Sequence, residues 1–272
     1  MTLFRPIVSF LVVAALAGSA MKAIAIMLLL LLSAGAARSG TNMPISPTPL
    51  VSVSPATAAN LPKLDPGVVA QFHPNAFVIS NNDSRDVVGL VVIWTYTDAT
   101  TGKTTTHYMN SDSFMQPTPR NVITAGTRLL VAPGVFLPEA MVSTAHLGPT
   151  VGNMDGSLVQ EMQGATNMTV NIDALIFSDG EVTGPNESRY DSQIENRKMA
   201  AVAIAKQVRN AMAKGQDPKT VLLDVLASQP AREDSLGRWR VNYAQMLARA
   251  RNLDKTLDGM ETLPDPPKFF HK

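Results

Sequence analysis

A run of aliphatic, β-branched and aromatic residues from Val87 to Thr97 constrains the fold of this chain more than any other feature. These residue types favour a β-strand over a helix. Apolar residues point to both sides of the strand through Ile93, which predicts a central strand covered on both faces at one end. The two predicted faces carry Val88, Leu90, Val92, Trp94 and Tyr96 on one side and Val87, Gly89, Val91, Ile93, Thr95 and Thr97 on the other.

Shorter strand patterns, separated by turn-forming residues, surround this run. The turns are expected at Asn81–Ser84, at Asp98–Lys103 and at Ser178–Gly180. Residues 133–166 show weak periodicity and are predicted as a loop with one short strand near Met141–Ser143, a long loop for a compact domain. The pattern predicts an antiparallel β-sandwich of the immunoglobulin or fibronectin type III kind over residues 67–186. Its other predicted strands are 76–80, 104–109, 121–125, 128–132, 168–177 and 181–183.

After Pro185 the periodicity becomes that of amphipathic helices. Ser188 and Asp191 have the spacing of a capping box for a first helix that ends at Gly215. Asp217-Pro218 begins a second helix that ends near Pro230. A third helix is predicted from Ser235 to Leu257, with Trp239 and Tyr243 on its apolar face. The chain is therefore predicted to be an α+β protein, in which about three helices over residues 187–260 pack within the chain and residues 261–272 form a disordered tail.

Four segments of the β region carry a resemblance to a known kind of module. They are Phe77–Asn81, Trp94–Asp98, Ile176–Gly180 and Gly184-Pro185-Asn186. Over roughly residues 70–190 the chain resembles immunoglobulin-like modules of uncharacterised exported bacterial proteins. The resemblance implies a β-sandwich but no activity, and it carries no site residues over to this chain.

The chain begins with a segment, 6–37, that is apolar except for Lys22. Lys22, the run Ala23–Leu32 and Ala34-Gly35-Ala36 correspond to the three parts of a secretory signal peptide, in which case Met21 is the true start. One alternative is an uncleaved membrane anchor, in which Lys22 would cost about 2.5–3.5 kcal/mol near the bilayer centre, and another is a buried cytoplasmic helix. We expect residues 1–37 to be a signal peptide or an anchor, and the proline-rich residues 38–66 to be an extended linker.

Composition excludes several classes of function. The chain has no cysteine, which excludes disulfides, thiolate metal sites, cysteine nucleophiles and a lipid-modified cysteine. Its formal net charge of +1 argues against a nucleic-acid partner, because phosphate binding needs a concentrated basic surface. We expect an extracytoplasmic protein, periplasmic or secreted, or one anchored in the inner membrane by its N-terminal segment.

No motif for catalysis, for a cofactor or for a metal is present, so we predict no catalytic, cofactor-binding or metal-binding residues and no cofactor. The histidines are not spaced as a metal pair, and His107 is expected at the surface. Asp173 could serve as a general base but is better explained as the solvent-facing side of a strand. The Asp-Gly pairs at 155–156 and 179–180 are expected to be turns, and Trp94 and Trp239 core anchors. The four histidines are His73, His107, His146 and His271.

The sequence therefore favours a non-catalytic binding or envelope-structural module with an envelope protein as a possible partner. Two alternatives stay open. One is an exported hydrolase, which a deep pocket joining Asp173, His107 or His146 to a serine or threonine would favour. The other is a membrane-tethered accessory subunit, which an uncleaved leader would favour.

Overall fold

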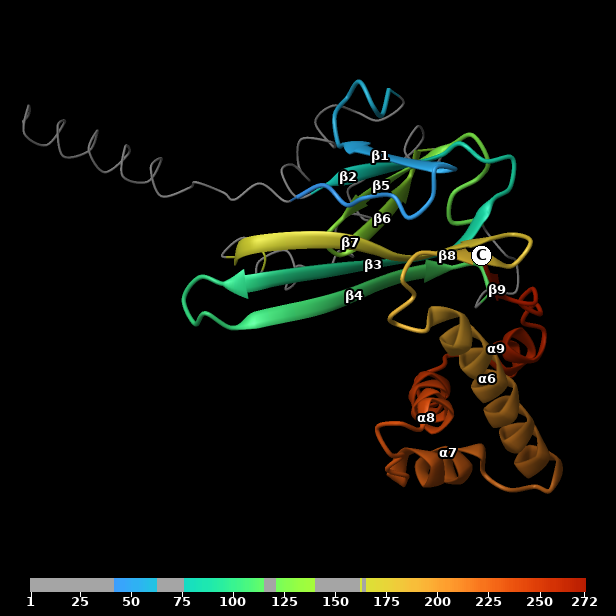
Figure 1. Ribbon diagram of the computed structural model, residues 1–272. Coiled ribbons are helices and arrows are strands. Elements are labelled where there is room, and N and C mark those ends of the chain that lie inside the picture. The colour runs from blue at the N-terminus through green and yellow to red at the C-terminus, as the bar shows by residue number, and fades with distance from the viewer. Residues whose placement is uncertain (1–41, 63–75, 115–120, 140–161, 163–164) are drawn as a thin grey trace, which may run out of the picture. The chain divides into compact units, whose positions relative to one another are not determined.

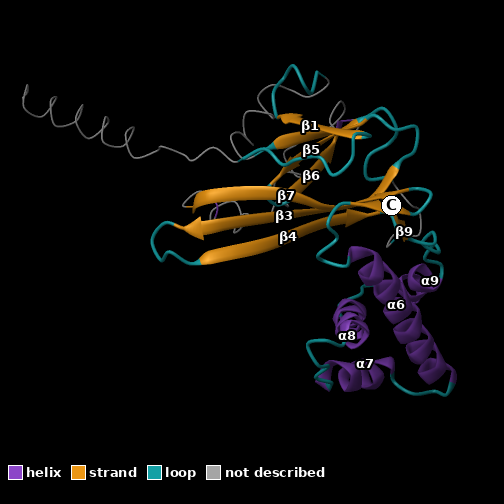
Figure 2. Ribbon diagram, viewed as in Figure 1, coloured by secondary structure: helices purple, strands orange, loops and turns teal. Residues whose placement is uncertain are grey.

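Two β-sheets and four helices make up the part of the chain that the computed structural model describes, residues 42–62, 76–114, 121–139, 162 and 165–272 (Figures 1 and 2). The predicted α+β class with a sandwich-like β region is confirmed. Neighbouring strands are antiparallel, except that β8 and β9 run parallel. One sheet has the spatial order β1 (Val51–Pro55), β2 (Phe77–Asn81), β5 (Arg128–Ala132), β6 (Val135–Pro138), and the other has the order β4 (Thr104–Asp112), β3 (Val87–Asp98), β7 (Ala165–Phe177), β8 (Glu181–Thr183), β9 (Phe270–His271).

The main core lies between the two sheets. Trp94 of β3 is fully buried there, with its ring centroid 6.0 Å from that of Phe77 on β2. The predicted grouping of Leu90, Val92, Trp94 and Tyr96 on one face of β3 is confirmed, and this face points into the main core. At the start of the strand the register shifts between Val87 and Gly89, so Val87 points inward and Val88 packs on the outer face.

Strand β7 contains a β-bulge at Asp173. Val91 pairs with Ala174 and Val92 pairs with Ile172, which leaves Asp173 without a partner in β3. Because an extra residue reverses the alternation of a strand, the predicted faces are confirmed up to Ile172 and are wrong beyond it. The inner face holds Met168, Val170, Ile172, Leu175 and Phe177, whereas Ala174 and Ile176 lie on the outer face.

The bulge also places the Asp173 side chain inside the protein, so the expected solvent-facing position is wrong. Asp173 is 1% exposed. Its carboxylate accepts hydrogen bonds from the backbone N–H groups of Glu187 (2.9 Å) and Ser188 (3.2 Å) and from the Ser188 hydroxyl (2.5 Å). Gly184 passes so close to β7 that a Cβ at this position would lie 2.5 Å from the Asp173 carbonyl oxygen. Asp173 therefore fixes the turn between β8 and the first helix to β7.

The predicted capping box at the start of that helix is wrong, because the Ser188 hydroxyl bonds to Asp173 instead. The helix α6 (Tyr190–Ala213) has Arg189 at its N-cap, in the left-handed conformation with φ 52° and without a side-chain cap. The Asn186 side chain takes over part of the capping, since its Oδ1 accepts a hydrogen bond from the Tyr190 N–H at 2.8 Å.

The helices form a second core of their own. The first turns of α6 pack on the outer face of the β3–β7 sheet, and the rest of α6 packs against α7 (Pro218–Ala227), α8 (Ser235–Ala248) and α9 (Leu253–Glu261). The expected packing of the helices within the chain and the Asp217 cap of α7 are confirmed. The prediction of a single third helix from Ser235 to Leu257 is wrong. α8 ends at Ala248, and Asn252 caps a new helix by accepting a hydrogen bond from the Lys255 N–H at 3.0 Å. Within the described ranges, no helix is both long and apolar enough to cross a bilayer.

Several segments predicted as irregular contain strands. The linker 38–66 includes β1, which pairs with β2 and buries Val51. The tail 261–272 includes β9, which pairs with β8. β6 lies in the predicted loop 133–166, whereas the expected strand 121–125 contributes only an isolated bridge between Ile123 and Val87. The strand expected near Met141–Ser143 lies outside the described residues.

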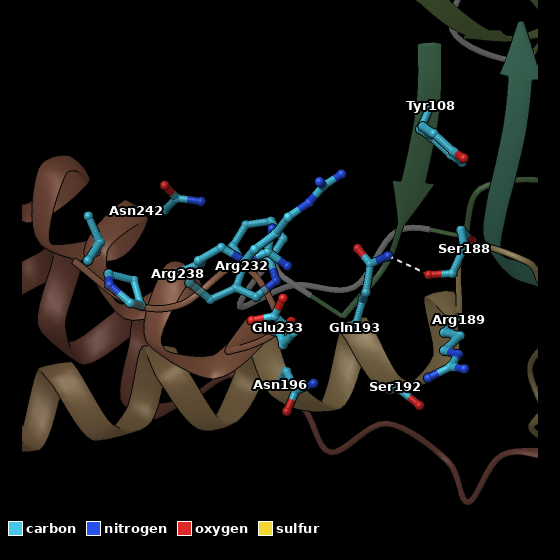
Figure 3. Close-up of a pocket in the computed structure, with 14 residues that line it drawn as sticks. Tyr108, Ser188, Arg189, Ser192, Gln193, Asn196, Arg232, Glu233, Arg238 and Asn242 are labelled. Carbon is cyan, nitrogen blue, oxygen red and sulfur yellow. Dashed lines mark hydrogen bonds between the residues drawn. The ribbon is translucent and has the colours of Figure 1, made fainter. Parts of the chain in front are cut away.

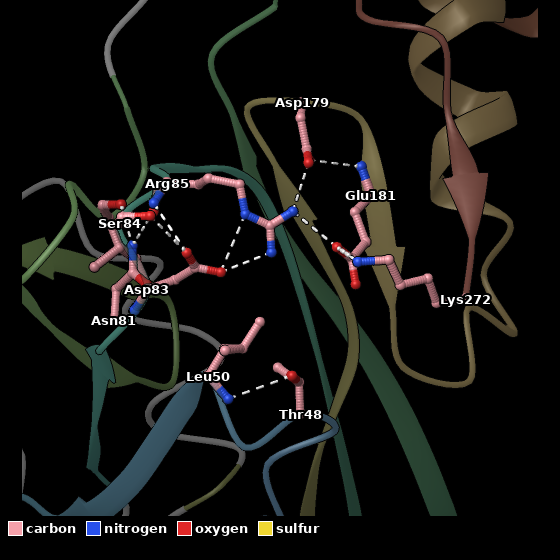
Figure 4. Close-up of polar contacts among 10 residues, drawn as sticks. Thr48, Leu50, Asn81, Asp83, Ser84, Arg85, Asp179, Glu181 and Lys272 are labelled. Atoms are coloured by element: carbon pink, nitrogen blue, oxygen red, sulfur yellow. Dashed lines mark hydrogen bonds and ion pairs between the residues drawn. The ribbon is translucent and has the colours of Figure 1, made fainter.

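A polar cluster around Arg85 joins three of these segments (Figure 4). The Arg85 guanidinium donates to Asp83 in the turn after β2, to Asp179 in the β7–β8 turn, and to Glu181 on β8, at 2.6, 2.6 and 2.7 Å. Lys272, next to β9, also donates to Glu181 at 2.7 Å. The cluster thus ties the turns at one end of the sandwich together.

We predict that this cluster gives the fold a stability that is lost in acid. The hydrogen bond from Arg85 lowers the pKa of Asp83 to about 2. Because this pKa lies below that of the unfolded chain, the stabilisation is present above about pH 4 and disappears as the pH falls toward 2. Asp83→Asn should lower the free energy of unfolding by about 1 kcal/mol at pH 7, with the difference shrinking at acid pH. Urea denaturation from pH 2 to 7 measures this, and a difference independent of pH would contradict it.

Candidate functional site

A polar cavity of about 780 Å³ lies among β4, the N-terminal half of α6 and the N-terminal half of α8 (Figure 3). In Figure 3, Arg232, Glu233 and Arg238 lie across from residues of α6, with Tyr108 of β4 at the edge. The cavity offers hydroxyl and amide groups for hydrogen bonds and two aromatic rings for stacking. These groups come from Ser192, Gln193, Asn196, Ser235 and Asn242, and from Tyr108 and Trp239.

The cavity wall carries more positive than negative charge. Arg189, Arg232 and Arg238 line it together with a single acid, Glu233. Among the described residues, no ion pair engages any of these three guanidinium groups. Arginine forms paired hydrogen bonds with carboxylates and phosphates. The cavity can therefore hold a polar ligand that carries an oxyanion.

Arg189 is held in a strained backbone conformation at this cavity. Its φ of 52° lies in the left-handed region, which two asparagines also adopt elsewhere in the chain. Asparagine tolerates this region well, whereas for other residue types it costs on the order of 1–3 kcal/mol. Such strain persists where surrounding contacts enforce it and clusters at binding sites. Here the contacts of Asp173 and Asn186 on either side of the turn enforce it.

A buried ion pair holds the wall of the cavity in place. Asp112 at the end of β4 accepts hydrogen bonds from the Tyr190 hydroxyl and from Arg197 of α6, both at 2.6 Å. Burial, together with the negative charge of Asp112, raises the pKa of Tyr190 well above its usual value. The Arg197 guanidinium lies over the Trp239 ring of α8, 5.0 Å from its centroid. Asp112 thus links β4 through α6 to Trp239.

A second cavity of about 660 Å³ adjoins the first, and Trp239 lines both. It is a groove between α8 and α9 with a largely apolar lining, to which the cationic residues Arg197, Arg251 and Lys255 also contribute. Its apolar side chains are Trp239, Tyr243, Met246, Met260 and Leu263. The prediction of a core position is confirmed for Trp94 and wrong for Trp239, which is partly exposed between the two cavities.

The histidines and acids weighed from the sequence lie elsewhere. His107 is half-buried rather than fully at the surface, and stacks on Tyr96 with its Nε2 3.2 Å from the tyrosine hydroxyl. His271 is exposed and lies 3.1 Å from Asp191. Asp173 bonds to Ser188 and not to His107. The predicted turn at 179–180 forms between β7 and β8. His73, His146 and the 155–156 pair lie outside the described residues.

The three arginines of the polar cavity were not found from the sequence. They come from three separate places, the residue before α6, the loop before α8, and α8 itself. No motif links them, and the basic residues of this part of the chain alternate with acids as on an ordinary solvated helix face. Across the described segments, no group of three acidic or histidine side chains is arranged to hold a metal ion.

We predict that the buried ion pair matters more to stability than a surface pair does. Asp112→Ala leaves the Arg197 guanidinium, 14% exposed, without its counter-charge, and should lower the free energy of unfolding by about 3 kcal/mol. The matched control is Asp265→Ala, which removes the 96% exposed partner of Lys198 and should cost less than about 1 kcal/mol. Urea denaturation compares the two variants, and equal losses would contradict the prediction.

Comparisons with known proteins found no match among family models, curated proteins or solved structures. The resemblance to immunoglobulin-like modules therefore stays a prediction. The functional interpretation of this chain depends on the geometry of the two cavities and on the chemistry of their side chains.

Proposed function

We propose that this protein is a non-catalytic, extracytoplasmic binding module whose ligand is a polar oxyanion held in the cavity among β4, α6 and α8. The observation that supports this proposal is the convergence of Arg189, Arg232 and Arg238 on one cavity, with no ion pair to them among the described residues. A guanidinium that forms no ion pair with the described residues is available to a ligand. The amides and hydroxyls nearby supply further hydrogen bonds.

In this proposal the β-sandwich, of the immunoglobulin-like kind, serves as a rigid support. Asp112 and Asp173 attach α6 to it, so the arginine before α6 and the aromatic ring of α8 keep fixed positions. Preorganised side chains lower the ordering cost of binding. An attached leader would make the same protein a membrane-tethered accessory subunit, and a cleaved leader would make it periplasmic or secreted.

Binding of inorganic phosphate tests the oxyanion site. Charge-assisted hydrogen bonds contribute about 1.5–3 kcal/mol each, so reversing two arginine charges in Arg232→Glu/Arg238→Glu should weaken binding at least about tenfold. The matched control is Arg249→Glu, an exposed arginine at the end of α8 that lines neither cavity. Isothermal titration calorimetry on the protein and both variants gives the dissociation constants. Equal affinity in the double variant and the control would refute the site.

The extracytoplasmic location predicts a specific mature N-terminus. If 1–37 is a signal peptide, N-terminal sequencing of the protein from its producing cell should give Ala37 or Arg38. An intact leader in the membrane fraction would support the anchor instead. A reporter fused after residue 66 that is active in the cytosol alone would refute export altogether.

A further inference from the structure

We infer that the ligand of this site is an anionic amphiphile, with its oxyanion head among the three arginines and its apolar chain in the groove between α8 and α9. The inference rests on the proposed function, because it names the chemical class that the same site accepts. It goes further in assigning the second cavity a role.

The two cavities form one path along α8. α8 lines the polar cavity with Ser235, Arg238 and Asn242, and it lines the groove with Tyr243 and Met246. Trp239 lines both cavities. Positions three and four apart lie on the same side of a helix. The part of the lining that α8 supplies therefore changes from cationic to apolar along the helix, as the polarity of an amphiphile does.

The groove is open, and its apolar lining is left without a cover by the described residues. α8 and α9 each pack against α6, whereas they contact each other little. Met246 is 45% exposed, and Gly259 of α9 adds no side chain to the lining. Aromatic rings and methionines adapt to apolar ligands of varied shape. An apolar surface of this kind is stabilised when a hydrocarbon chain displaces its water.

The charge of the groove lining favours an anionic occupant. Arg251 and Lys255 belong to this lining. Two acids of α9 are held at α6, where Arg209 bonds Asp254 at 2.6 Å and also pairs with Asp258. Within the described part of the chain, no ion pair engages Arg251 or Lys255. The apolar leader of this chain is a poor occupant, since the charges beside its two apolar blocks, Arg5 and Lys22, are positive.

An acidic amphipathic helix from another protein matches the lining less well. Such a helix carries charge along its whole length. In the structure Arg189, Arg232 and Arg238 line the polar cavity, and the adjoining groove is mainly apolar, with Arg251 and Lys255 from the segment after α8. A single charged head followed by a hydrocarbon chain fits that order.

The experiment compares the binding of butyl phosphate, dodecyl phosphate and dodecyl maltoside, each below its micelle concentration, to the protein purified from its producing cell. Each methylene that leaves water adds about fourfold in affinity. Dodecyl phosphate should therefore bind at least about a hundredfold more tightly than butyl phosphate, and more tightly than the uncharged dodecyl maltoside. Calorimetry gives the affinities, and the tryptophan fluorescence should change with the long chain, because Trp239 lines the groove whereas Trp94 is fully buried in the sandwich.

Two Met→Glu variants distinguish an effect in the groove from an effect of added charge elsewhere on the protein. Met246→Glu places a charge in the groove and should lower the ratio of the affinities for dodecyl and butyl phosphate at least about tenfold. Met199→Glu, at a methionine of α6 that is 53% exposed and lines neither cavity, should leave it unchanged. Circular dichroism confirms that both variants fold.

The outcomes distinguish this inference from the proposed function. Equal binding of butyl and dodecyl phosphate would overturn the amphiphile but leave the oxyanion site standing. Dodecyl maltoside binding as tightly as dodecyl phosphate would overturn the anionic head. No binding of any phosphate would overturn both the inference and the proposed function.

Discussion

The buried carboxylate of Asp112 is the interaction on which the arrangement of sandwich, helices and cavities depends. It receives the Tyr190 hydroxyl and the Arg197 guanidinium from α6, and Arg197 in turn lies over the ring of Trp239. A carboxylate this deeply buried is tolerated because both oxygens are satisfied: Oδ2 accepts from Tyr190 and Arg197, and Oδ1 accepts from the Phe114 N–H at 3.0 Å. The contacts of Tyr190, Arg197 and Trp239 join the sheet to α6 and α6 to α8. One polar centre therefore links the sandwich to the helices and positions Trp239 at the site.

The helices provide most of the lining of two adjoining cavities, one polar and one largely apolar. The polar cavity needs β4, α6 and α8, while the groove needs α8 and α9. The break between α8 and α9 is essential, because a single straight helix through this region would have no second wall. Asn252, which caps α9, is thus a structural requirement for the groove.

The parts predicted well from the sequence are those that local pattern determines. The grouping of side chains on the two faces of β3, the Asp217-Pro218 helix start and the burial of Trp94 follow from side-chain alternation and capping chemistry. The predictions were wrong where a residue or strand far away in the sequence determines the local structure. β1 and β9 are strands because β2 and β8 hold them, and Ser188 serves Asp173 rather than its own helix. The three arginines escaped prediction for the same reason, since only the tertiary fold brings them to one cavity.

The bulge at Asp173 makes β7 sensitive to its length rather than to its composition. The extra residue lets Ile172 and Leu175 both face the inner core, although they are an odd number of positions apart. Removing one residue here would turn Leu175 and Phe177 out of the core and bring their neighbours in. Across related chains, this strand should thus accept exchanges between apolar side chains far more readily than insertions or deletions.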